Sequence, residues 1–339
     1  TGRHLAVTYM LDRAGKLLEG SIALGLGRRR LRLIVIEATD ILNASVIGGD
    51  TYDCVVIGGG PAGLTAAIHL RRMGRGVRLV DAGASRAQRI ARAFNVAGYP
   101  EGVVGGHLLE RMRQHLRAAD GHVTYDSVEE VRRCPDHKFL VRLKHGTMLA
   151  RSVILCTGAA DPAIDLSGID AVASAGLLRI HSRLGVEELA GKRVGVLDSP
   201  SGVSCSASLR DMCPKSRIIA LDSLIQSRIA IHRQPVWIVY PALHAALLDS
   251  HKAVSVTCDD GRAYEFDLLL SAADELPRTS LAKGLAVRLG ANGAIAIGPT
   301  GLTSADNVYA AGEVAGVPCQ IDIAIGQAAV AAAAVHDTL

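Results

Sequence analysis

The first strong pattern of hydrophobic positions in the chain predicts a strand, a turn, a helix and a second strand. Cys54–Ile57 is a short, wholly apolar run, typical of a parallel strand that is buried on both faces. Glycines dominate the next residues, 58–63, and apolar residues then recur at helical spacing over 64–70. The next strand, Val77–Val80, is apolar except for Arg78 and ends on Asp81. This order predicts a βαβ unit with two parallel strands side by side.

A similar unit is expected in the second half of the chain. Arg193–Leu197 predicts a strand, a helix follows over about 204–212, and the strand Ile218–Leu221 leads to Asp222. Leu268–Leu270 adds a further strand to this unit. Strands that alternate with helices favour parallel sheets covered by helices on both faces. We therefore expect an α/β fold with two Rossmann-like domains of three layers each.

The remaining segments carry weaker patterns. Residues 1–49 form an extension to which we assign no function, with a weak helix expected over Leu11–Leu26 and a short strand at Ile34–Ile36. Elsewhere the pattern predicts a helix at Gly106–Ala118, strands at His122–Thr124, Phe139–Val141 and Ser152–Leu155, and a long alanine-rich helix from about Ile323.

Composition excludes several classes of protein. The chain has 339 residues, 49% of them hydrophobic, and a formal net charge of +4, which is typical of a globular protein long enough for two domains. Basic residues are scattered apart from Arg28–Arg30 and Arg32, so we expect no nucleic-acid partner. No apolar run reaches the length of about 18 residues that a membrane span requires. We expect a cytoplasmic protein without a secretory signal.

The cysteines indicate neither a metal centre nor a local redox pair. Seven are present, and no two of them have the spacing of a zinc site or of a Cys-x-x-Cys motif. We expect no bound metal, a reducing compartment, and thiols that are mostly buried as small hydrophobic groups.

The glycine-rich turn has the G-x-G-x-x-G spacing, at Gly58, Gly60 and Gly63. The first glycine permits a tight turn, the second lets a pyrophosphate approach the backbone, and the third lets the helix pack closely on the strand. The N–H groups at the start of the helix then bind the phosphates. A carboxylate at Asp81 suits ribose hydroxyls, so the turn predicts a dinucleotide site rather than an empty glycine-rich loop.

Four segments in the same order give the chain, from about residue 51 to its end, a family resemblance. They are 58–63, 95–102 (Asn-Val-Ala-Gly-Tyr-Pro-Glu-Gly), 155–159 (Leu-Cys-Thr-Gly-Ala) and 303–321. The chain resembles the thioredoxin reductase-like FAD-dependent oxidoreductases, the class II pyridine nucleotide-disulfide oxidoreductases. The resemblance implies a discontinuous FAD-binding domain at 50–160 and 273–339, with an inserted NAD(P)-binding-like domain at 161–272.

The resemblance also implies which residues bind FAD. Asn95 is expected beside the flavin ring, and Glu313 stands where the family usually has the shorter Asp. The turn at Gln320 begins the last helix, whose N-terminus favours negative charge on a reduced flavin. The full predicted set is Gly58, Gly60, Pro61, Ala62, Gly63, Asp81, Asn95, Thr157, Gly158, Gly312, Glu313, Gln320 and Ile321.

The redox disulfide of the family is missing from the sequence. His181 and Leu184 stand at the two cysteine positions of the corresponding segment. Cys205 and Cys213 do not replace them, because eight residues on one expected helix separate their Cα atoms by about 12 Å. A disulfide tolerates no more than about 7 Å. The chain is therefore an atypical member that is not expected to reduce thioredoxin.

The second dinucleotide unit also departs from the family pattern. After Leu197 the chain reads Asp-Ser-Pro-Ser-Gly, so Asp198 brings negative charge to the phosphate turn and Pro200 has no N–H to donate. Asp274 stands where a glycine is usual. Binding of NAD(P)H is therefore doubtful, although Asp222 would suit the unphosphorylated ribose of NADH better than NADPH.

No catalytic residue is assigned. His181 would suit a general acid or base near the flavin, and Arg183 could orient an acidic substrate. Cys319 precedes the flavin-contacting turn. A structural interpretation is favoured for His181, as a partly exposed loop histidine, and for Cys319, as a buried helix-cap cysteine.

Three hypotheses remain open. The leading one is an FAD-dependent oxidoreductase without the family's disulfide, which acts with oxygen or with an unidentified donor on a small-molecule substrate. The alternative is a non-catalytic flavin-binding pseudoenzyme or scaffold protein. An incompletely folding fragment is the third, because the chain begins with Thr rather than Met. The family resemblance adds the expectation of a homodimer.

Overall fold

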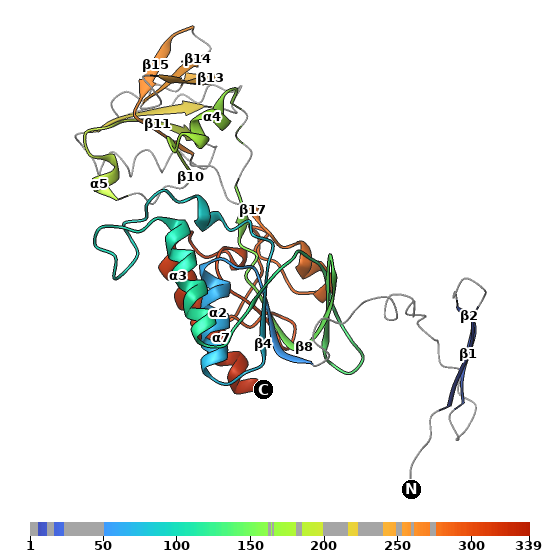
Figure 1. The fold of residues 1–339 in the computed structure, drawn as a ribbon. Helices are drawn as coiled ribbons and strands as arrows, with labels where there is room; N and C mark the ends of the chain where they lie inside the picture. Colours follow the sequence, from blue (N-terminus) through green and yellow to red (C-terminus); the bar gives the residue numbers. More distant parts are fainter. Residues whose placement is uncertain are drawn as a thin grey trace.

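The computed structural model describes residues 6–11, 17–23, 51–161, 164, 166–180, 185–198, 216–222, 240–248, 253–258, 261–271 and 276–339. Over these residues the chain forms two larger sheets with helices packed against them (Figure 1). The α/β fold class predicted from the sequence is confirmed, whereas the predicted domain boundaries stay a prediction.

The first sheet contains the predicted βαβ unit. Its strands run in the order β5-β4-β3-β8-β7-β6, and β18 pairs with the end of β8. The strands β3, β4, β5 and β18 are parallel to their neighbours, while β6, β7 and β8 form an antiparallel meander. Their bounds are β3 Tyr52–Ile57, β4 Val77–Asp81, β5 Val123–Tyr125, β6 Val128–Arg133, β7 Phe139–Leu143, β8 Gly146–Leu155 and β18 Val308–Ala310.

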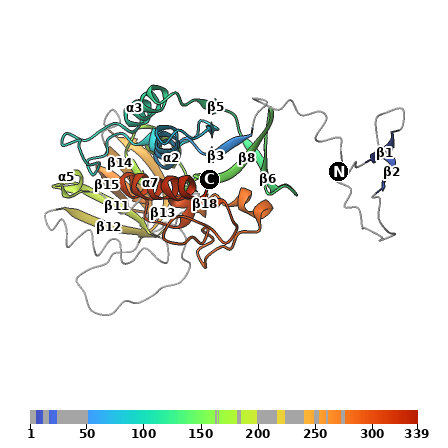
Figure 2. The ribbon, with the colours of Figure 1, turned by 90° about the horizontal axis from the view of Figure 1, so that it is seen from below.

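Three helices cover one face of this sheet: α2 (Pro61–Arg72), α3 (Gly105–Ala118) and α7 (Ile321–Thr338). Alternate residues of β3 point to opposite faces, so Cys54 packs under the helices and Val55 packs against the meander strands. Small side chains let α2 and α7 approach closely, and Figures 1 and 2 show the two helices side by side.

The second sheet has the order β10-β16-β11-β12-β13-β14-β15. It is parallel from β10 to β13 and antiparallel from β13 to β15. The short helices α4 (Ile169–Ser174) and α5 (Val186–Leu189) belong to the same part of the chain. The strands are β10 Leu178–Ile180, β11 Arg193–Asp198, β12 Arg217–Asp222, β13 Tyr240–Leu248, β14 Ala253–Cys258, β15 Ala263–Phe266 and β16 Leu268–Ser271.

A two-stranded link joins the chain segments that run between the two sheets. β9 (Ala159–Ala160) pairs antiparallel with β17 (Leu276–Pro277). The backbone N–H of Arg278 donates to the carbonyl of Gly158 at 2.9 Å, which extends the pairing by one step. The outgoing and returning segments therefore lie side by side, next to the carboxyl end of β8.

One expectation for the first residues is wrong. Leu17–Ala23, within the expected helix over Leu11–Leu26, is the strand β2, which pairs antiparallel with β1 (Ala6–Leu11). Gly20 and Ser21 are poor helix formers, and the β-branched and aromatic residues of β1 offer a strand partner. The expected strand at Ile34–Ile36 and the expected helix over 204–212 lie outside the described residues.

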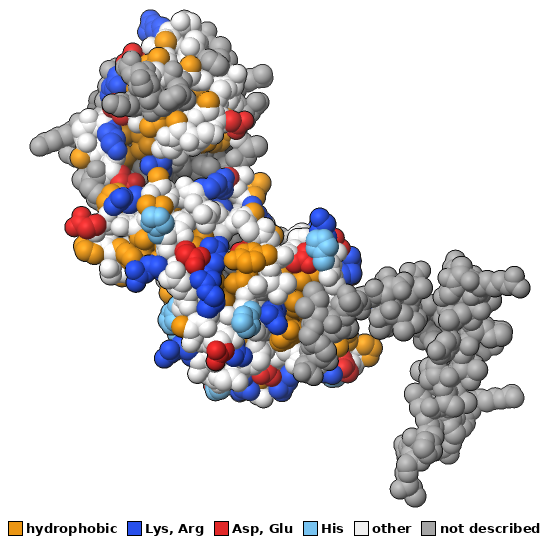
Figure 3. Space-filling model, in the orientation of Figure 1, with side chains coloured by type: hydrophobic (Ala, Val, Ile, Leu, Met, Phe, Trp, Pro, Cys, Tyr) orange, Lys and Arg blue, Asp and Glu red, His pale blue; other side chains and the backbone are white. Residues whose placement is uncertain are grey.

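Basic and acidic side chains are interspersed on the face of the molecule shown in Figure 3. Among the described residues, no helix has both the length and the apolar character that a bilayer crossing needs. The same part of the chain holds no group of three or more His, Cys, Asp or Glu side chains placed to bind a metal ion.

Candidate functional site

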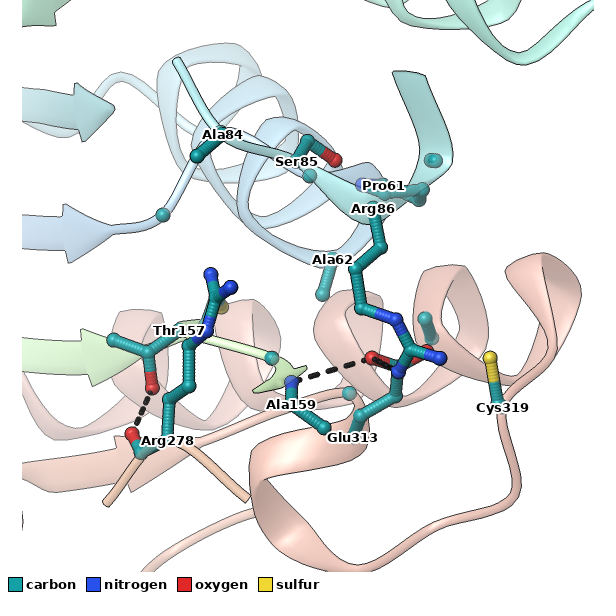
Figure 4. Close-up of a pocket in the computed structure, with 18 of the residues that line it drawn as sticks. Pro61, Ala62, Ala84, Ser85, Arg86, Thr157, Ala159, Arg278, Glu313 and Cys319 are labelled. Atoms are coloured by element: carbon teal, nitrogen blue, oxygen red, sulfur yellow. Dashed lines mark hydrogen bonds and ion pairs between the residues drawn. The ribbon is translucent and has the colours of Figure 1, made fainter. Parts of the chain in front are cut away.

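A cavity of about 490 Å³ opens at the carboxyl ends of β3, β4 and β8. This volume lies within the range of about 300–1,000 Å³ that is usual for small-molecule and cofactor sites. The walls come from the start of α2, the loop after β4, the link between the sheets and the segment before α7 (Figure 4). Leu178 and Arg179 of β10 also reach the cavity.

The glycine-rich turn forms the floor beside the helix N-terminus. Gly58 has φ +109°, and a Cβ there would lie 2.2 Å from the carbonyl oxygen of Cys156. A Cβ on Gly63 would lie 1.8 Å from the carbonyl oxygen of Gly58, so only glycine lets α2 begin this close to β3. Gly60 caps α2 without a side chain, and the first turn contains no acidic residue. The positive end of the helix therefore faces the cavity without a carboxylate of its own.

Asp81 supplies a buried carboxylate at the end of β4. Its side chain is 4% exposed, and its Oδ1 accepts the N–H groups of Gly59 at 3.2 Å and Gly83 at 3.1 Å. Its Oδ2 is buried and has no hydrogen-bond partner among the described residues. A buried carboxylate oxygen without a donor is costly, and a ligand hydroxyl would satisfy it. The residues present therefore fit the ribose of a dinucleotide.

The cavity continues past Asp81 to residues that the sequence interpretation missed. Asp126, Ser127 and Val128 line this end, directly after β5. Tyr125 stands in register with Asp81, and the N–H of Asp126 donates to the Asp81 carbonyl at 3.1 Å. The strand was expected from the sequence, but its place beside β4, which brings these residues into the site, was not.

Thr157 and Gly158 lie where β8 meets the link. The hydroxyl of Thr157 donates to the carbonyl of Arg278 at 2.7 Å, which fixes the side chain against the returning segment (Figure 4). Gly158 has φ +69°, so the turn after β8 requires a left-handed residue. Arg278, Ser280 and Leu281 of the returning segment line the same wall of the cavity.

An ion-pair cluster lies directly beside the turn after β8. Glu313 begins the short helix η4 (Glu313–Ala315), and its Oε2 accepts Arg86 Nη1 at 2.9 Å and the Ala159 N–H at 3.3 Å. Arg86 belongs to η1 (Arg86–Arg89) in the loop after β4, and its Nε pairs with Asp161 Oδ1 at 2.7 Å. Arg89 also pairs with Asp161. No sequence motif signals this cluster, because its members come from three distant segments.

The start of α7 closes the cavity. Gln320 is the N-cap residue of α7, and Cys319 precedes it at the cavity wall (Figure 4). The N–H of Ala97 donates to the side chain of Asp322 at 3.1 Å, so the segment that carries Asn95 is held against this helix. Asn95 therefore lines the same cavity as Gln320, although the two are far apart in the sequence.

The thiols of Cys54 and Cys156, near the site, are expected to be unreactive. Burial raises the pKa of Cys54 to about 12, and burial likewise raises the pKa of Cys156, with a further contribution from Cys54. Both thiols stay protonated near neutral pH, and neither is suited to nucleophilic or redox chemistry.

The structure brings the predicted cofactor residues together. All of them except Gly63 line the cavity, and Gly63 lies directly behind the turn. Their role in binding stays a prediction. His181, Arg183, Leu184, Cys205, Cys213, Pro200 and Asp274 lie outside the described residues. For Asp198 and Asp222 the structure describes the backbone, in which the two stand in register at the ends of β11 and β12.

Comparison with known proteins assigns this architecture to a family. The family model described as pyridine nucleotide-disulphide oxidoreductase matches residues 52–328. The chain is similar to an alkyl hydroperoxide reductase subunit of Pseudomonas putida, with 27% identity over 308 residues, covering 86% of this chain and 58% of that protein. It therefore spans less than two thirds of the length of this relative.

Other similarities are to thioredoxin reductases and to solved structures. The thioredoxin reductase of Bacillus subtilis is 30% identical over 119 residues, covering 34% of this chain and 37% of that protein. The structure described as "Crystal structure of HlmI" has a TM-score of 0.77 and 26% identity, covering 87% of this chain and 94% of that chain. The thioredoxin reductase of Streptococcus pyogenes, at 21% identity and a TM-score of 0.73 over 85% of this chain and 97% of that chain, supports the fold alone.

Proposed function

The chain belongs to the pyridine nucleotide-disulphide oxidoreductase family, whose members are FAD-dependent oxidoreductases, and we propose that it binds FAD in the cavity beside β3 and acts as an oxidoreductase without the family's disulfide. The proposal rests mainly on the buried carboxylate of Asp81, at the end of β4. Its Oδ2 has no hydrogen-bond partner among the described residues. Asp81 lies on the same cavity as the glycine-rich turn and the N-terminus of α2, where no side chain caps the helix.

Each part of the cavity has a role in holding the cofactor. The N–H groups at Gly60 and the start of α2 would hold the pyrophosphate, and Asp81 would accept the hydroxyls of the adenosine ribose. Residues 126–128 would lie beside the adenine, while Asn95 and the turn at Gln320 would hold the flavin ring. FAD would supply hydride or single-electron transfer at this ring, and the protein supplies binding, orientation and charge.

We infer that the chain does not pass electrons through a dithiol. His181 and Leu184 occupy the positions of the family's two cysteines, and leucine forms neither a disulfide nor a thiolate. The thiols of Cys54 and Cys156 offer no replacement, because burial raises the pKa of each. The electron acceptor would then be oxygen or a small molecule that reaches the flavin directly.

Binding of a pyridine nucleotide is proposed to be weak. Asp198 and Asp222 stand in register at the ends of the parallel strands β11 and β12, the edge where a dinucleotide binds in such sheets. Asp222 suits a ribose, but a second aspartate at the neighbouring strand end opposes a pyrophosphate. Pro200 removes one backbone donor from the turn that follows.

Flavin analysis of the purified protein tests the cofactor assignment. We expect one FAD per chain, released on denaturation as intact FAD, and apoprotein that recovers the flavin when FAD is added back. Apoprotein that takes up no FAD would contradict the proposal. A parallel assay of disulfide reduction, with thioredoxin and an aromatic disulfide as acceptors, should show no turnover above that of a denatured control.

A non-catalytic flavin-binding protein is the second candidate. The same two departures, at the disulfide segment and at the second dinucleotide turn, favour it. It predicts bound FAD with no oxygen consumption and no peroxide production over a wide range of electron donors. Sustained peroxide production with any donor would exclude it.

A further inference from the structure

The cluster on the cavity wall holds Arg86 between two carboxylates. Its Nη1 contacts Glu313 Oε2 at 2.9 Å, and its Nε contacts Asp161 Oδ1 at 2.7 Å. The Arg86 side chain is 11% exposed, so these pairs lie largely out of water. Charge-assisted hydrogen bonds of an arginine fork are both stronger and more directional than those of an exposed pair.

Only one oxygen of Glu313 is used by the described part of the protein. Its Oε2 accepts both Arg86 and the N–H of Ala159, whereas Oε1 has no hydrogen-bond partner among the described residues. Glu313 is one methylene longer than the aspartate usual in the family, so its side chain has one additional rotatable bond. The ion pair with Arg86 and the hydrogen bond from the Ala159 N–H together restrict rotation about this bond.

The Oε1 atom of Glu313 is a suitable acceptor for one group of hydroxyls in FAD. A carboxylate is only an acceptor, and the donors that FAD offers along its length are mainly hydroxyls. Asp81, at the end of β4 on the same cavity, is the acceptor proposed above for the adenosine ribose. The hydroxyls of the ribityl chain are left for Glu313, which begins η4 and lies near the start of α7.

We propose that Arg86 is a positioning residue for the cofactor, which fixes Glu313 through Oε2 so that Oε1 accepts a ribityl hydroxyl. The inference rests on the proposed binding of FAD in this cavity. Asp161 has the supporting role of holding the second edge of the Arg86 guanidinium, and it lies in the outgoing segment of the link. The longer glutamate and the arginine then act as one unit in place of a single aspartate.

Flavin titration of apoprotein variants tests the proposal. Arg86→Met should raise the Kd for FAD about tenfold or more, the loss expected for one partly buried charge-assisted hydrogen bond. Because FMN contains the ribityl chain but lacks adenosine, the Kd for FMN should rise by a similar factor. Arg86→Lys, which retains the charge without the fork, should have an intermediate effect.

Two further variants separate positioning from folding. Arg117→Met removes an ion pair with Glu110 on α3, away from the cavity, from a side chain that is 55% exposed, and it should change both Kd values less than about threefold. In a Glu313→Gln background, Arg86→Met should cause little additional loss, because the carboxylate that it positions is already gone. Apoprotein melting temperatures report whether any variant is simply less well folded.

The outcomes distinguish this inference from the proposed function. Wild-type apoprotein that binds no FAD would contradict the function itself. Wild-type binding with an unchanged Kd in Arg86→Met would overturn only the role of Arg86. A rise in the Kd for FAD without a rise in the Kd for FMN would also overturn the proposed role of Arg86, since Arg86 would then act on the pyrophosphate or adenosine.

Discussion

The sharpest single perturbation is Asp81→Asn, because it separates the stability of the free protein from its affinity for the cofactor. Asparagine keeps the Oδ1 acceptor that receives the N–H groups of Gly59 and Gly83. It replaces Oδ2, which has no partner among the described residues, with an NH₂ group of nearly the same size. The fold should tolerate the change, while an acceptor for a ligand hydroxyl is lost.

The expected changes in stability and in the Kd for FAD follow from the hydrogen bonds that Asp81 makes in the free protein and in the FAD complex. Two charge-assisted bonds become neutral ones, at a loss of about 1 kcal/mol each, and the exchange of an unpartnered charged oxygen for an unpartnered neutral NH₂ group returns part of this loss. The free energy of unfolding of the apoprotein should therefore fall by no more than about 2 kcal/mol. Loss of one charge-assisted bond to the ribose should raise the Kd for FAD about ten- to hundredfold.

Two measurements on the same samples check this prediction. Chemical denaturation of apoprotein gives the stability, and flavin titration gives the Kd values for FAD and for FMN. FMN is the internal control, because it lacks the adenosine ribose that Asp81 is proposed to bind. An unchanged Kd for FAD, or an equal rise for FAD and FMN, would refute the placement of the ribose at Asp81.

Two more predictions follow from the turn and from the buried thiols. Gly58→Ala should destabilise the apoprotein by about 2–4 kcal/mol, because its backbone is left-handed and its Cβ would meet the Cys156 carbonyl. The matched change Gly60→Ala, whose Cβ would lie 3.3 Å from Ser85 Oγ, should leave the melting temperature nearly unchanged and weaken FAD binding. Because the folded-state pKa of Cys54 is raised from 9.0 to about 12, its contribution to stability is present below pH 9 and declines as the pH rises toward 12. Native protein at pH 8 should resist iodoacetamide at Cys54 and Cys156 until it is unfolded, as mass spectrometry of the labelled peptides would show; rapid labelling of either in the native state would contradict their burial.

The part of the fold that the sequence predicts best is the β3–α2–β4 unit. Its strands are mostly apolar, its turn needs glycines with specific backbone conformations, and the contacts within the unit join segments that are neighbours in the sequence. The antiparallel strands β13, β14 and β15 were not expected. The alternation of Val254 and Val256 with Ser255 and Thr257 was a usable strand signal within them.

The site is predictable only as far as the family motifs extend. Asn95 and Gln320 could be predicted as cofactor residues because each belongs to a motif of the family, and both line the cavity, although their contact with FAD stays a prediction. Arg86 and Asp161 carry no motif, and their pairing arises only when the loop after β4 meets the link between the sheets. Residues 126–128 enter the site through the parallel register of β5 with β4, which a single sequence does not specify.

The central claim is that this chain keeps the flavin pocket of its family but not the family's reduction by pyridine nucleotide. Anaerobic mixing of the FAD-loaded protein with NADPH, and separately with NADH, tests it directly through the visible absorbance of the oxidised flavin. We expect slow or absent bleaching by both nucleotides, while dithionite bleaches the same sample completely. Rapid and complete bleaching by either nucleotide would contradict the account of Asp198, Pro200 and the second dinucleotide turn.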